Sequence, residues 1–330
     1  MTGIRLGLLA VAAMGGVAFA QPQDGPRADH HQHLFGPAIV ARATTPMEMV
    51  DADRLIGLLD QAGIRQAAVL SLAYMYGNPN RPPVEHEYEA VKAENDWTSA
   101  QVAKYPDRLV AFCSVNPLRP YALDEIARCA GDPRLKRGLK LHFGNSDVNL
   151  TNPADAARLR EVFALANRHR MAIVVHARTT ISKQRPYGAE HARVFLETLL
   201  PAAPDVPVQI AHLAGSGGYD EDGVDAALGV FVDAIAAKDP RVAKLWFDVS
   251  GIALIGNWPR PAARVAERIR QLGVERVLWG ADGAAGGTTP TAAWKAFTET
   301  PLTPREIETI RSNVAPYLRE NAANHPTGGA

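Results

Sequence analysis

Eight short apolar stretches, rich in β-branched residues, recur along the chain, and each is followed by an amphipathic helical pattern. Strands that alternate with helices predict a parallel sheet. Eight such units in 330 residues predict an α/β fold, the (β/α)8 TIM barrel. The expected strands are 28–35, 67–74, 109–116, 137–143, 171–177, 206–213, 245–251 and 276–282.

A doubly wound open sheet is the main alternative. Such a sheet would have a Gly-rich phosphate turn after its first strand, and HLFGPAIV does not supply one. No shift in composition marks a linker, so we expect residues 21–330 to form a single domain. Asp51 and Thr303 are suitable N-caps, and the final helical pattern covers 303–321.

The first 20 residues have the pattern of a secretory signal peptide. A weakly basic start precedes the apolar run 6–20, which ends in Ala18-Phe19-Ala20, an A-x-A-like cleavage site. The run is short for a membrane span of ~20 residues, although an uncleaved anchor is the alternative. We therefore expect an exported protein, periplasmic or secreted, that has no membrane association after cleavage.

The balance of positive and negative residues limits the classes of partner that this chain is expected to bind. Lys and Arg total 35 and Asp and Glu total 35, so no nucleic-acid or anionic-membrane footprint is expected. A small-molecule substrate is expected, and a homodimer is compatible with such a barrel. The two cysteines, Cys113 and Cys129, fall in one strand–helix pair, where they could form a disulfide or remain buried thiols.

Polar residues gather where the predicted strands end. In a (β/α)8 barrel the active site lies at these carboxyl ends. The residues expected there are Asp29, His31, His33, Lys140, His142, His176, Arg178, His212, Asp248, Ser250 and Asp282.

The stretch ADHHQHLFG brings three histidines to the first strand. Because side chains alternate along a strand, Asp29, His31 and His33 are expected on one face, and His30 on the opposite one. A lone H-x-H is a weak metal signal. With His or Asp on the fifth, sixth and eighth strands as well, the set suits a zinc-like ion with an open position for water.

The chain resembles the amidohydrolase superfamily, specifically its amidohydrolase-related branch of hydrolases and decarboxylases. The resemblance rests on D-x-H-x-H, GLKLHF, VVHAR, IAHLAG, RVLWGAD and the closing ETIRSNVAPYLR. It implies that His31, His33, His176 and Asp282 bind a metal and that His212 lies beside the metal-bound water or substrate. The family often has Ser-Asp-x-Pro at the eighth strand, where this chain has Gly280-Ala281-Asp282-Gly283.

These residues suit hydrolysis of a small ester, lactone or amide by metal-activated water. A bound ion lowers the pKa of its water toward ~7 and polarises a carbonyl. Asp282 would then serve as general base and later as acid, and His212 would stabilise the oxyanion or shuttle protons. Two alternatives remain, a metal-dependent decarboxylase of a small carboxylic acid and a catalytically silent ligand-binding barrel.

Four further residues have open or supporting roles. Arg178 could clamp a substrate carboxylate or be an ordinary rim residue. Lys140 could be carboxylated and bridge a second metal, but we expect a plain lysine that, like His142, contacts substrate. One divalent ion is expected, zinc first and manganese as the alternative. Asp248 is expected to support the site rather than bind metal.

Overall fold

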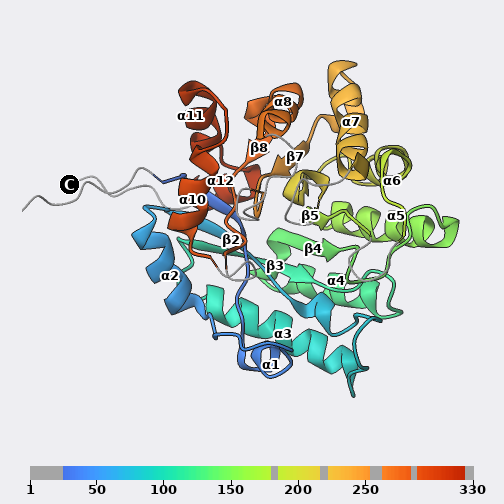
Figure 1. The fold of residues 1–330 in the computed structure, drawn as a ribbon. Coiled ribbons are helices and arrows are strands. Elements are labelled where there is room, and N and C mark those ends of the chain that lie inside the picture. The colour runs from blue at the N-terminus through green and yellow to red at the C-terminus, as the bar shows by residue number, and fades with distance from the viewer. Residues whose placement is uncertain (1–24, 180–184, 216–221, 253–261, 284–287, 324–330) are drawn as a thin grey trace, which may run out of the picture.

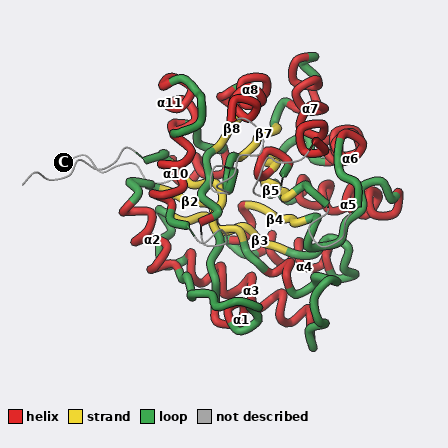
Figure 2. Tube along the Cα trace, in the orientation of Figure 1, coloured by secondary structure: helices red, strands yellow, loops and turns green. Residues whose placement is uncertain are grey.

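The computed structural model describes residues 25–179, 185–215, 222–252, 262–283 and 288–323. An eight-stranded parallel sheet runs through them in the order β1 to β8, and helices surround it (Figures 1 and 2). Trp279 O accepts the His30 amide at 3.0 Å and His31 O accepts the Asp282 amide at 2.9 Å, so β8 meets β1. The predicted (β/α)8 barrel is confirmed. The strands are β1 Ala28–Gln32, β2 Gln66–Leu70, β3 Leu109–Ser114, β4 Gly138–His142, β5 Ala172–His176, β6 Val208–Ile210, β7 Leu245–Asp248 and β8 Val277–Leu278.

The helices follow the predicted pattern with three differences. Helices α1 (Pro37–Val40) and α10 (Pro290–Thr298) were not expected, and the final pattern is divided because Pro316 lacks an amide donor and disfavours helix at the residue before it. The expected caps are confirmed: Asp51 accepts the Arg54 amide, and Thr303 forms a capping box. The helices are α1 Pro37–Val40, α2 Ala52–Gln61, α3 Glu87–Val102, α4 Ala122–Gly131, α5 Pro153–Arg168, α6 Ala189–Val194, α7 Asp222–Ala236, α8 Ala262–Leu272, α10 Pro290–Thr298, α11 Pro304–Ser312 and α12 Pro316–Ala323.

Alternation along the strands divides the core into two layers. One set of side chains packs against the helices, and the other forms a smaller cluster inside the barrel, which includes Leu70, Phe112 and Val174. Tyr317 and Leu318 of α12 belong to this inner cluster. Gly138 makes the packing possible, because a Cβ there would lie 2.1 Å from the Phe112 ring. The last helix therefore contributes to the barrel interior.

The prediction that His30 faces away from the barrel interior is wrong. A register shift between Asp29 and Gln32 gives β1 an extra residue against β2 and breaks the strict alternation. His30 therefore lies against Tyr317 of the inner cluster, with ring centroids 6.3 Å apart. Its Nδ1 donates to Trp279 O at 2.8 Å, and its Nε2 accepts the Ala315 amide at 3.1 Å.

The same bulge separates Asp29 from the face assigned to His31 and His33. Its carboxylate accepts the amides of His31 at 3.0 Å and Ala281 at 3.1 Å, and the Gln32 side chain at 2.7 Å. Asp29 thus joins β1 to the end of β8. Burial, the largest influence, raises the pKa of Asp29 to about 7.

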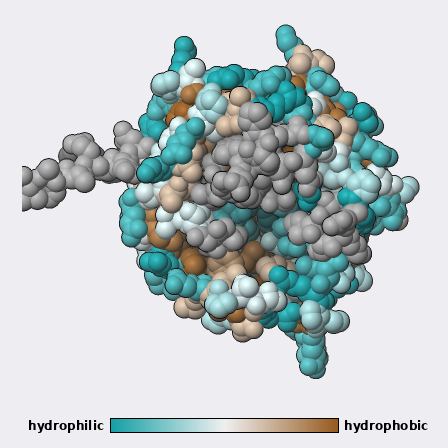
Figure 3. Space-filling view, viewed as in Figure 1, coloured by the Kyte–Doolittle hydropathy of each residue, from teal (hydrophilic) through white to brown (hydrophobic). Residues whose placement is uncertain are grey.

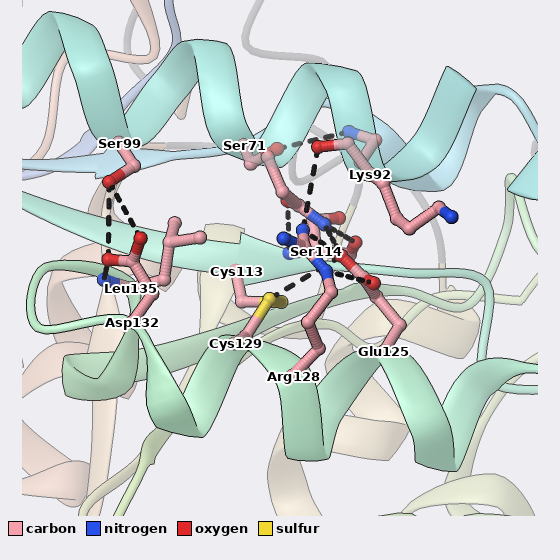
Figure 4. The surroundings of a disulfide bond; sticks show 12 residues. Ser71, Lys92, Ser99, Cys113, Ser114, Glu125, Arg128, Cys129, Asp132 and Leu135 are labelled. Atoms are coloured by element: carbon pink, nitrogen blue, oxygen red, sulfur yellow. Dashed lines mark hydrogen bonds and ion pairs between the residues drawn. A yellow bond between two sulfur atoms is a disulfide. The ribbon is translucent and has the colours of Figure 1, made fainter. Parts of the chain in front are cut away.

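Cys113 of β3 and Cys129 of α4 form a disulfide, so the open question about the two thiols is resolved in favour of a bond (Figure 4). The bond fastens one helix of the outer ring to the strand beneath it. Beside it, the buried carboxylate of Glu125 accepts hydrogen bonds from Arg128 Nε at 2.8 Å and from Asn95 Nδ2 at 2.7 Å. This strand–helix pair is therefore held by covalent and charged links.

The visible surface is mainly hydrophilic (Figure 3). Across the described ranges, Met49 is the exposed large hydrophobic side chain. No helix within these ranges has both the length and the apolar character needed to cross a bilayer. The expected signal peptide, residues 1–20, lies outside the described residues.

Candidate metal centre

His31 and His33 project from β1 and the residue just beyond it, and hydrogen bonds hold both rings in one orientation. His31 Nδ1 donates to Asp248 Oδ2 at 3.1 Å, and His33 Nδ1 donates to Leu70 O at 2.7 Å. Because both acceptors are oxygens that only accept, the proton lies on Nδ1 and each Nε2 presents a lone pair. His33 Nε2 lies 3.6 Å from Asp282 Oδ1, and His31 Nε2 lies 3.9 Å from the same oxygen.

His212 has the same arrangement after β6. Its Nδ1 donates to Ser250 O at 2.7 Å, and its Nε2 lies 3.9 Å from Asp282 Oδ2. Its backbone adopts a left-handed conformation with φ 55°, rare for a residue other than glycine, and its amide donates to Asp248 Oδ1 at 3.0 Å. Asp248 thus positions both His31 and His212. Backbone strain of this kind is often found at functional sites.

Asp282, just after β8, lies at the centre of these imidazoles. It too has a left-handed backbone, with φ 46°. Its Oδ1 is buried and has no hydrogen-bond partner among the described residues. The ligand atoms of His31, His33 and Asp282 all lie within 4.8 Å of one another. A carboxylate facing imidazole lone pairs, with a buried oxygen lacking a donor, fits a bound cation.

His176, at the end of β5, lies beside this group. Its ring is 5.1 Å from the His212 ring and stacks on His142 with centroids 3.9 Å apart. Its Nε2 is buried and has no partner in the part of the chain that the structure describes. The His31, His33 and Asp282 group does not include His176. The structure therefore places His176 next to the centre, with a nitrogen available to a ligand.

Burial favours the neutral form of four of these imidazoles. It is the main reason that the pKa values of His33, His142 and His176 lie well below the ordinary 6.5, and neighbouring cationic groups lower them further. The pKa of His212 is also lowered, mainly by burial. Neutral imidazole is the form that binds metal ions. The site is therefore ready for a metal at neutral pH.

Lys140 lies among the ligands rather than at the rim. It is buried, and its Nζ donates to His31 Nε2 at 3.2 Å. Burial lowers its pKa to about 8, although the charges of Asp282 and Asp248 oppose this shift. His142 stacks on His176, and its Nδ1 accepts the Asn145 amide at 3.2 Å. Both remain candidates for substrate contact.

Arg178 lies two residues beyond the end of β5 and is partly exposed. The structure thus places it just beyond the carboxyl end of β5. Ser250, expected at the end of the seventh strand, supports the site, because its carbonyl accepts the Nδ1 proton of His212. Gln209 and the Leu70 carbonyl were not predicted as supporting groups, and a backbone carbonyl leaves no trace in residue identity.

Comparison of the chain with sequence profiles of known families identifies the family to which it belongs. The profile described as amidohydrolase matches residues 28–323. The chain belongs to the amidohydrolase family. The resemblance seen in the sequence motifs is thereby confirmed, and this amidohydrolase is an enzyme of a metal-dependent family whose donor set is present here.

Solved structures share this amidohydrolase's fold. It resembles 2,6-dihydroxybenzoate decarboxylase from Rhizobium, with a TM-score of 0.61, 16% identity, and 91% of this chain and 99% of that chain covered. It also resembles the 5-carboxyvanillate decarboxylase from Novosphingobium aromaticivorans, complexed with manganese. The TM-score is 0.60 and the identity 13%, with 91% of this chain and 95% of that chain covered. A third similar structure is a probable 2-pyrone-4,6-dicarboxylic acid hydrolase from Acinetobacter baumannii. Its TM-score is 0.57 and its identity 18%, with 91% of this chain and 98% of that chain covered. Comparison with curated proteins finds no match.

Proposed function

We propose that this amidohydrolase is a metal-dependent hydrolase of a small ester, lactone or amide. One observation carries the proposal: the Nε2 atoms of His31, His33 and His212 surround Asp282, whose buried Oδ1 has no protein donor among the described residues. A carboxylate so placed can bind a cation and also accept a proton.

His31, His33, His176 and Asp282 would hold the ion. Zinc suits this nitrogen-rich set best, with manganese as the alternative. The ion would supply Lewis acidity to a carbonyl oxygen and an acidified water. Because His31 Nε2 would then be occupied, Lys140 would lose its acceptor, and its ammonium could donate to a substrate oxygen.

The protein residues have separate tasks in this proposal. Asp282 takes the proton of the attacking water and returns it to the leaving group. His212 presents a lone pair at Nε2, because its Nδ1 proton is given to Ser250 O, and can therefore relay a proton rather than donate to an oxyanion. This tautomer favours the shuttle role over the oxyanion role.

A substrate panel tests the proposal. The mature protein, loaded with zinc or manganese, would be assayed with lactones, esters, amides and aromatic acids for acid, alcohol or amine release and, separately, for CO2. We expect hydrolysis, lowered about 100-fold or more in kcat by Asp282→Asn. Asp124→Asn, an exposed change on α4, is the matched control. CO2 release without hydrolysis would assign a carboxy-lyase, and binding without turnover a silent barrel.

A further inference from the structure

We propose that Tyr317, at the start of α12, is a positioning residue for the metal centre and acts on His31 through Gln209 and Asp248. The inference rests on the proposed metal-dependent function and extends it to the last helix of the fold.

A chain of hydrogen bonds runs down the barrel axis from the centre. His31 Nδ1 donates to Asp248 Oδ2 at 3.1 Å, and Gln209 Nε2 donates to the same oxygen at 2.6 Å. Tyr317 Oη donates to Gln209 Oε1 at 2.5 Å. All four side chains are at most 5% exposed. The chain thus joins α12 to a metal ligand without passing through solvent.

The donors and acceptors of this chain can be arranged in only one way. A carboxylate accepts only, so Gln209 must turn its NH2 group toward Asp248. The amide oxygen of Gln209 then faces Tyr317, which must donate. The same Nε2 also lies 3.3 Å from His30 O, which again requires a donor there. The Asp248 carboxylate and the His30 carbonyl therefore set the orientation of the Gln209 amide, and the Tyr317 hydroxyl supplies the donor that its buried oxygen needs.

Asp248 is the point where this chain reaches the centre. Its Oδ1 accepts the amides of His212 at 3.0 Å and Ser250 at 3.1 Å, while Oδ2 serves His31 and Gln209. Without the Tyr317 hydroxyl, the buried amide oxygen of Gln209 would lack a donor, and the Gln209 side chain would shift to find one. Asp248 would shift, and the imidazole of His31 would lose the partner that fixes its tautomer.

The composition of the barrel interior supports a role beyond packing. Such interiors are usually filled with branched apolar side chains. A buried chain of polar groups is costly unless every member is paired, and here Tyr317 completes the pairing. The ring of Tyr317 packs against Phe112 with centroids 5.0 Å apart, so Tyr317→Phe would keep this contact and remove only the hydroxyl.

Metal affinity is the readout. Metal-free wild type, Tyr317→Phe and Tyr105→Phe would be titrated with Zn2+ and Co2+ against a chelator, and the visible spectrum of the Co2+ form recorded. Tyr105→Phe is the control because it removes a surface hydroxyl that donates to Asp53. We expect Tyr317→Phe to bind metal about 10-fold or more weakly, with an altered Co2+ spectrum. The control should match wild type.

Two further outcomes separate this inference from the proposed function. Wild-type affinity and spectrum in Tyr317→Phe would overturn the inference alone. Failure of wild type to bind either metal would overturn both proposals. If Tyr317→Phe does not fold, Gln209→Met replaces it: weaker metal binding supports the chain, and unchanged binding overturns it. In the double variant, the two losses should not add, because they interrupt one chain.

Discussion

At the residue scale, the centre depends on which nitrogen of each imidazole carries the proton. Oxygen acceptors hold the Nδ1 protons of His31, His33 and His212, and this turns each Nε2 lone pair toward Asp282. The left-handed backbones of His212 and Asp282 bring their side chains to the same point. The chemistry of the site therefore comes from backbone geometry as much as from residue type.

His30→Ala should lower stability without removing the metal. The His30 ring satisfies the Ala315 amide, and leaving this buried donor unpaired costs about 1–3 kcal/mol, whereas Trp279 O keeps the backbone amide of residue 30. Urea denaturation measures the stability loss, and elemental analysis the bound metal. Loss of metal in a folded His30→Ala protein would show that His30 is a ligand and contradict this account.

The sequence predicted the residues of the site better than their orientations. H-x-H spacing and the strand-end positions of His212 and Asp282 were sufficient to select residues now found together, and His176 lies beside them. Strict alternation gave the wrong side for His30, because an extra residue in β1 changes the face without any signal such as glycine or proline. Partners such as the Leu70 carbonyl depend on backbone position and could not be predicted.

At the element scale, the Cys113–Cys129 bond fastens α4 to β3 across 16 residues of chain. Closing a loop of this size stabilises a fold by about 3 kcal/mol, mainly by restricting the unfolded chain. We expect the double variant Cys113→Ala/Cys129→Ala to lose about that much free energy of unfolding in denaturant titration. Equal stability of variant and wild type would show that packing alone holds this pair.

Helix α3 carries a buried acid that predicts an unusual pH dependence. Burial raises the pKa of Glu94 to about 7, and its only described partner is Tyr76, whose hydroxyl lies 3.4 Å away. The folded state therefore binds a proton that the unfolded state releases near pH 4.5. The contribution of Glu94 to stability is full below pH 4.5 and is lost as pH rises through about 7.

Glu94→Gln should thus stabilise the protein at pH 8 by up to about 3 kcal/mol and change little at pH 4. Thermal or urea denaturation of both proteins at the two pH values measures the difference. Glu85→Gln, an exposed change, is the control. A Glu94→Gln effect of the same size at both pH values would contradict the shifted pKa.

Elements were predicted well where the pattern was long and periodic. All eight strands and their order followed from the apolar stretches. The division of the last helix required Pro316 to outweigh a continuous amphipathic pattern, and α10 follows residues 284–287, which the structure does not describe. Neither difference affects the predicted position of the site residues, because these lie at the carboxyl ends of strands that were placed correctly.

At the scale of the whole molecule, we propose that the protein is exported after residues 1–20 are removed. A disulfide is typical of proteins outside the reducing cytoplasm, and Cys113–Cys129 supports this location. The mature protein should begin at Gln21 and be recovered from the periplasm or medium. Recovery of an intact Met1 terminus in the cytoplasm would contradict export.

The barrel as a whole brings together side chains that lie about 250 residues apart in the chain, from His31 to Asp282. The metal content of the purified protein tests most directly whether they form a metal centre. We expect about one equivalent of zinc or manganese in the purified wild type and less than about a tenth in His33→Ala. His169→Ala, exposed after α5, should retain the full equivalent. Equal metal content in His33→Ala and wild type, or a fully active wild type without metal, would contradict the account.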